Sequence, residues 1–189
     1  MAKSRNNVVM RGASGKVGKM LVFRQKAGST IIADVPKINP DRVPTDDQLS
    51  VQERFTDAAF YAKRAIGDPD LKERYQQKAK PGQTAYNMAF KDYLTDPEIR
   101  KVFVDRYLGA IGDEITIRVR DVLEVKQVHV DIVDGNGVAV EDGLAVATDE
   151  TATEWIYTAT AANETLTGSA ITITLVNTPG NTASTIIEL

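Results

Sequence analysis

The sequence predicts a mixed α+β protein with several domains: an N-terminal β-hairpin arm, a small helical unit and an all-β sandwich. Apolar residues recur at helical spacing in residues 45–100, whereas they alternate with polar residues in 111–189. Charge changes sign at the same place, because residues 1–110 carry a net +7 and residues 111–189 carry −10. We therefore expect three parts, namely residues 1–44, 45–110 and 111–189.

The first 44 residues predict a basic hairpin arm and a linker. Two short apolar runs, Lys19–Gln25 and Ser29–Val35, flank a loop that contains Gly28, which is typical of a β-hairpin. Three prolines in residues 36–44 exclude regular structure there, because proline fixes φ and lacks an N–H donor. We expect this segment to be an extended linker.

Residues 45–110 predict a small helical domain. Thr45 and Gln48 have the spacing of a capping box, so a helix begins here, and Gly67 ends it. Asp68-Pro69 opens a second helix with a capping carboxylate, and Thr95–Glu98 predicts a further helical turn. The apolar stripes are Val51, Phe55, Ala58, Ala59, Ala62 and Ile66, then Leu71, Tyr75 and Ala79, then Ala85, Tyr86, Ala89, Phe90, Tyr93 and Leu94 of a third helix.

Residues 111–189 predict about six or seven short strands. Asp134–Gly137 and Thr178–Asn181 are tight-turn sequences, while Leu144–Ala147 and Trp155–Thr158 are strand candidates. Many short antiparallel strands around one buried Trp are typical of an immunoglobulin-like sandwich. The alternating apolar positions are Ile115, Ile117 and Val119, then Val128, Val130 and Ile132, then Ile171, Ile173 and Leu175.

Composition excludes several classes of site. The chain has no Cys, which excludes disulfides, Cys-ligated zinc, iron–sulfur clusters and thiol catalysis. Its one His, His129, lies between Val128 and Val130, so we expect it on the outward face of a strand. Asp131 and Asp134, with Asn136, offer oxygen ligands for calcium, but without the acidic ladder of an EF-hand a plain turn is favoured.

A glycine motif, Gly12–Gly18, imitates a dinucleotide fingerprint because Asp34 follows at about the expected spacing. No further βα units follow it, and Val17 stands where a phosphate-binding Walker loop needs Ser or Thr. No nucleophile, base and orienting partner occur at a recognised spacing. We therefore predict no catalytic residue, no cofactor, no metal site and no enzymatic activity.

The N-terminus is basic, but its apolar stretch, Val8–Met10, is too short for a signal peptide. No apolar run approaches the roughly 18 residues of a membrane span. We expect the protein to act away from membranes, in the cytoplasm or in an assembly built there.

The arm carries seven basic residues before the first acid, Asp34. This local charge suits phosphates or an acidic protein face, and a small polar hairpin buries too little to be stable alone. The segment Leu71–Ala79 and the helical aromatics also suggest an HMG-type nucleic-acid-binding unit, although aromatics at helical spacing are more often core. The candidate partner-binding residues are Arg11, Lys16, Lys19, Arg24 and Lys26.

One pattern resembles the N-terminal part of a phage and prophage structural protein family that includes virion components of crAss-like tailed phages. The matching residues are Gly15–Gly18, Pro36-Lys37, Asn39-Pro40, Thr45, Gln48 and Arg54-Phe55. In such chains an acidic immunoglobulin-like domain can follow, and the resemblance carries over no catalytic residue. It implies a virion protein that is assembled in the host cytoplasm: an auxiliary capsid, head-fibre-associated or neck component.

The leading hypothesis is thus a non-enzymatic interaction protein whose basic arm and helices anchor it to other virion proteins in a symmetric assembly. The alternative is an HMG-like nucleic-acid-binding protein that uses the same basic arm. The sequence leaves open whether the arm binds protein or nucleic acid.

Overall fold

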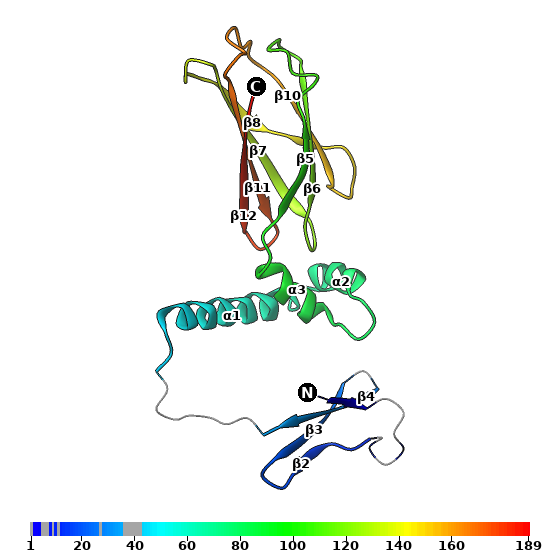
Figure 1. Ribbon diagram of the computed structural model, residues 1–189. Coiled ribbons are helices and arrows are strands. Elements are labelled where there is room, and N and C mark those ends of the chain that lie inside the picture. Colours follow the sequence, from blue (N-terminus) through cyan, green and yellow to red (C-terminus); the bar gives the residue numbers. More distant parts are fainter. Residues whose placement is uncertain (1, 5–7, 9, 11, 27, 36–42) are drawn as a thin grey trace. The chain divides into compact units, whose positions relative to one another are not determined.

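The computed structural model describes residues 2–4, 8, 10, 12–26, 28–35 and 43–189. Across these residues the chain is mixed α+β, as the sequence predicts; it has three helices and three four-stranded antiparallel sheets (Figure 1). The chain divides into two compact units, residues 1–49 and 50–189.

The first unit contains a four-stranded sheet, called sheet A, with the strand order β1-β4-β3-β2. The predicted hairpin is confirmed as β3 and β4, which pair antiparallel from Leu21 opposite Asp34 to Lys26 opposite Ser29. Two short strands that the sequence did not predict extend it on either side. The strands are β1 (Ala2–Ser4), β2 (Gly15–Val17), β3 (Leu21–Lys26) and β4 (Ser29–Asp34). Most of the predicted proline linker, residues 36–42, lies outside the described residues.

The first two helices begin where their predicted caps place them, and the third begins at Ala85, the first residue of its predicted apolar stripe. The capping box before α1 (Asp46–Ala65) is formed, since Thr45 N donates to Gln48 Oε1 and Gln48 N donates to Thr45 Oγ1. Asp68 Oδ1 caps α2 (Pro69–Lys78) by accepting from Asp70 N at 3.0 Å. Thr84 Oγ1 caps α3 (Ala85–Tyr93).

The predicted apolar stripe of α1 is buried only in its second half. Ala58 and Ala62 are fully buried, but Val51 and Phe55 are 51% and 52% exposed. The reason is length: α1 has 20 residues, whereas α2 and α3 have 10 and 9. At 1.5 Å per residue α1 is about 30 Å long, so the shorter helices cover only part of it.

Two further four-stranded sheets, B and C, lie face to face in residues 98–189 (Figure 1). The predicted alternation is confirmed, because Ile115 and Ile117 of sheet B and Ile171 and Ile173 of sheet C are 0% exposed. Trp155 belongs to the same apolar core. Sheet B has the order β5 (Glu98–Phe103), β6 (Glu114–Arg120), β10 (Glu154–Thr158) and β9 (Val146–Ala147). Sheet C has the order β12 (Thr182–Glu188), β11 (Ala170–Asn177), β7 (Val125–Val133) and β8 (Ala139–Leu144).

One local prediction for this region is wrong, and one strand was missed. Thr95–Glu98 does not open a helical turn; strand β5 starts at Glu98 and pairs with β6, within the range 45–110 that we assigned to the helices. Apolar Ile99 and Val102 pack against the sandwich core, and this tertiary burial outweighs the local capping signal. Strand β8 was not predicted, because its sequence contains two acids and a glycine.

The helices contact the sandwich through polar and apolar groups. Asn181, in the turn between β11 and β12, donates from Nδ2 to the carbonyl oxygens of Asp92, Tyr93 and Thr95 at 3.2, 2.9 and 3.2 Å. Leu123, from the loop between β6 and β7, packs into the helical core. Helix α3 and the first turn after it are therefore held by the sandwich itself.

Candidate functional site

Sheet A separates its side chains into a basic face and an apolar face. Val22, Arg24 and Lys26 alternate along β3 and so point to the same side of the sheet. Lys16 of β2 lies opposite Val22 and therefore shares that side. We call the exposed side chains of Lys16, Arg24 and Lys26 the basic face.

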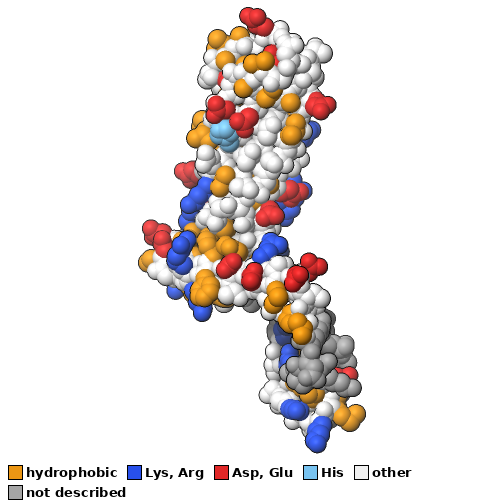
Figure 2. Space-filling view, turned by 90° about the vertical axis from the view of Figure 1, so that its left-hand side faces the viewer, with side chains coloured by type: hydrophobic (Ala, Val, Ile, Leu, Met, Phe, Trp, Pro, Cys, Tyr) orange, Lys and Arg blue, Asp and Glu red, His pale blue; other side chains and the backbone are white. Residues whose placement is uncertain are grey.

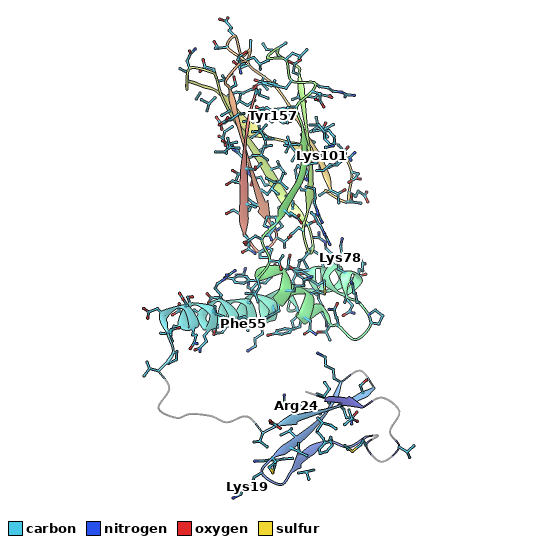
Figure 3. All side chains as sticks on the ribbon, viewed as in Figure 1. Lys19, Arg24, Phe55, Lys78, Lys101 and Tyr157 are labelled. Atoms are coloured by element: carbon cyan, nitrogen blue, oxygen red, sulfur yellow. The ribbon has the colours of Figure 1, made fainter. Side chains whose placement is uncertain are left out.

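The basic face is not neutralised within the chain. Among the described residues, no ion pair includes Lys16, Arg24 or Lys26. Asp34 is the one acid in the described strands of sheet A; it lies opposite Leu21 and therefore on the other face. Exposed Lys19 stands in the turn between β2 and β3, at the end of this hairpin (Figure 3). This cationic surface is thus available to an anionic partner.

The opposite face of sheet A, which we call the apolar face after Val17, Leu21 and Phe23, also carries Asp34 and is only partly covered. Gln25 Nε2 donates to Ala13 O at 2.6 Å, and Thr30 Oγ1 donates to Met10 O at 2.9 Å, so the preceding loop lies over one end of this face. At the other end Val17 and Leu21 stay exposed. Among the side chains described in sheet A and its loops, only that of Thr30 is fully buried.

The glycines of the imitated nucleotide motif form turns. Gly15 opens β2 with φ +108°, and Gly18 adopts φ +60° in the turn before β3. Strand β3 follows this turn and pairs with β2, so the strand-to-helix step of a dinucleotide site is not found among the residues described here. Arg11, a predicted partner-binding residue, lies outside the described residues.

His129 lies on the outward face of sheet C, as predicted. Its Nδ1 is 3.1 Å from Asp131 Oδ2, and its Nε2 is 3.4 Å from Asp142 Oδ2 of β8. Figure 2 shows this single histidine, in pale blue, at the surface beside acidic side chains. In the described part of the chain this is the one group of side chains whose spacing suits a metal ion. The sequence missed Asp142 because β8 was not predicted.

The turn after β7 is a hairpin turn, as predicted. Asp134 Oδ1 accepts from Asn136 N at 2.9 Å and from Val138 N at 2.8 Å, and these bonds lower the pKa of Asp134. Asp131 contacts His129 instead, so the oxygen ligands that we considered for calcium do not converge.

A buried acid lies where the helices meet the sandwich. Asp92 of α3 accepts from Tyr75 Oη at 2.6 Å, and Tyr75 Oη is 2.8 Å from Tyr61 Oη. Burial raises the pKa of Asp92 to about 7, and the charge of Asp121 contributes in the same direction. Burial also raises the pKa of Asp121. One oxygen of each carboxyl, Asp92 Oδ1 and Asp121 Oδ2, is buried without a hydrogen-bond partner. Sequence reasoning missed this pair because nothing in the pattern brings the two together.

No family model, curated protein or solved structure matches this chain. No helix in the described residues is long and apolar enough to cross a bilayer.

Of the five predicted partner-binding residues, the structure thus describes four. It brings Lys16, Arg24 and Lys26 to one face and places Lys19 in the adjacent turn. The two-residue period of a strand is the signal for this face. Arg24 and Lys26 are two residues apart on β3, and Lys16 lies opposite Val22 of the same strand.

Proposed function

We propose that this chain is a non-enzymatic structural protein that binds an acidic surface of a larger assembly through the basic face of sheet A. The observation that carries the proposal is the separation of charge: Lys16, Arg24 and Lys26 share one side of the sheet, and Asp34 lies on the other. A surface of one charge sign attracts and orients a partner of the opposite sign.

A partner would also stabilise sheet A. A single sheet with one covered end buries little apolar surface, and small isolated sheets are marginal in water. Val17 and Leu21 are 59% and 38% exposed on the apolar face. A partner that also covered this opposite face would remove these side chains from water.

The sandwich is proposed to be immunoglobulin-like, and its strand order supports this. Named A, B, C, C′, D, E, F and G in chain order, β5 to β12 give one sheet in the order A-B-E-D and a second in the order G-F-C-C′. These are the orders of immunoglobulin sheets. Such a domain would offer its surface for contacts.

The assembly is proposed to be a virion, and the partners other virion proteins. Support comes from the residues that resemble the phage structural family, of which Gly15–Gly18 forms β2 and the turn after it. The HMG-like alternative receives less support, because the aromatics that it needs are packed: Tyr75 is fully buried, and Phe90 packs against Phe55 and Tyr86. Binding to nucleic acid would therefore depend on sheet A.

The test replaces Lys16, Arg24 and Lys26 together by Glu and measures the copies of the protein in particles purified from cells infected by the phage that encodes it. We expect at least a tenfold loss of incorporation, because three attractive charges become repulsive. The matched control replaces the exposed Lys63, Lys72 and Lys78 of the helices by Glu, which changes the net charge equally and should preserve incorporation.

Two results would overturn the proposal. Incorporation of the sheet A variant at the normal level would show that the basic face is not the anchor. A shift of double-stranded DNA by the native chain at low salt, lost in the sheet A variant, would instead favour the nucleic-acid alternative.

A further inference from the structure

The edge strands of the sandwich differ in how they are protected. An edge strand exposes backbone N–H and C=O groups, so natural sheets shorten, bulge or charge their edges to prevent pairing. Strand β9 has only two residues. Strand β5 has a register shift and carries Glu98, Arg100 and Lys101. Strand β8 has a register shift and carries Glu141 and Asp142.

Strand β12 has none of these features. It is seven residues long, and it pairs with β11 without any register shift. Its one charged residue, Glu188, is the last of the strand, and Ile186 is 65% exposed. Within residues 98–189, all of which are described, β12 is the edge that has none of these protections; β5 of the facing sheet comes near it but does not pair with it.

The direction of the free backbone groups follows from the bonds at the two ends of β12. Leu189 N donates to Ser169 O at 2.9 Å, and Asn181 O accepts from Asn177 N at 3.1 Å, so both residues direct their backbone groups toward β11. Successive residues of a strand alternate. The backbone groups of Thr182, Ser184, Ile186 and Glu188 therefore point to the open edge, and no hydrogen bond in the described part of the chain involves them.

We propose that β12 pairs with β12 of a second copy of this chain, antiparallel about a two-fold axis at Thr185. In this register Ser184 lies opposite Ile186 and Thr182 lies opposite Glu188, so the outward backbone groups meet one another over the whole strand. Glu188 faces Thr182 and not a second acid, so no like charges are opposed. The same patch serves both copies, as a two-fold interface requires, and two four-stranded sheets become one continuous sheet.

A single edge strand gives a small interface, so free copies associate weakly and an array of anchored copies associates more strongly. The pairing uses no residue of sheet A. It therefore goes beyond the proposed anchoring function, and either can fail without the other.

The first test follows the mass of the full-length chain by analytical ultracentrifugation as its concentration is raised. The native chain should form dimers, and Ile186→Lys should weaken dimerisation about tenfold or more by adding a charge to the edge. Leu144→Lys is the matched control, because Leu144 is 56% exposed on β8, at the opposite edge of the same sheet. This control and the triple Glu variant of sheet A should dimerise normally.

A second test checks the register. The chain has no Cys, so Thr185→Cys introduces a single thiol. At the two-fold axis the two Thr185 residues form a non-hydrogen-bonded pair with Cα atoms about 4.5 Å apart, within the range of a disulfide. Mild oxidation should give a covalent dimer of Thr185→Cys and none of Leu144→Cys. A native chain that stays monomeric, a Thr185→Cys variant that does not cross-link, or a dimer that Ile186→Lys leaves unchanged would overturn the proposal.

Discussion

Sheet A and the sandwich are both antiparallel, yet they bury very different amounts of apolar surface. In the sandwich two sheets face each other, and Ile115, Ile117 and Ile173 are fully shielded from water between them. In sheet A one described side chain, Thr30, is fully buried. Since burial of apolar surface is the main driving force for folding, the sandwich holds itself together, whereas sheet A gains little from a core of its own.

The largest change in the free energy of unfolding should come from a substitution in the sandwich core. Ile173→Ala should lower the free energy of unfolding by about 2–5 kcal/mol, because it leaves a cavity among fully buried side chains. Phe23→Ala on sheet A should change the free energy of unfolding by less than about 0.5 kcal/mol. Urea unfolding followed by the fluorescence of Trp155, the single Trp, measures the stability of the sandwich in both variants. Equal losses for the two variants would contradict the contrast.

A smaller effect on the stability of the folded chain should depend on pH. It should arise from residues 50–189. The pKa of Asp92 is 3.8 in a model compound and about 7 here, so the folded chain holds more protons between these values. Stability should therefore fall as pH rises from about 4 to 7. Asp92→Asn should flatten this profile, because the amide accepts from Tyr75 and needs no proton.

Thermal unfolding at several pH values measures this effect. Asp134→Asn is the control, since the pKa of Asp134 is lowered and its contribution has the opposite sign, present above pH 4 and lost below it. A flat profile for the native chain would show that Asp92 does not titrate on unfolding.

The smallest effect should come from removing residues 1–35. The melting temperature of the remaining chain should stay within about 1 °C of that of the full chain, a change that corresponds to a small fraction of a kcal/mol. The reason is that sheet A belongs to a separate compact unit. Differential scanning calorimetry of the full and shortened chains makes the comparison. A shift of several degrees would mean that sheet A stabilises the sandwich.

Local sequence signals predicted most elements whose residues also face a core. The predicted capping residues Thr45 and Asp68 each begin a helix, because a cap acts within one turn. Alternation found β6, β7 and β11, whose inward side chains are buried. The same signals failed where distant residues decide, as for β5, which forms because β6 lies beside it.

The candidate sites show the same limit. The basic face could be predicted because its residues are close in sequence and follow the strand period. The pair of Asp92 and Asp121, and the approach of Asp142 to His129, depend on elements that meet only in the folded chain. The open edge at β12 is defined by strand order, which one sequence does not specify.

The three bonds of Asn181 also determine how the molecule carries mechanical load. They fix the start of β12 beside the end of α3, close to where β5 begins, and Leu189 ends the chain at the far end of β12. A pull between an anchored arm and residue 189 would thus run along β5 and β12. The ladder bonds of antiparallel strands lie perpendicular to the strands, so this pull would load them together in shear rather than one at a time.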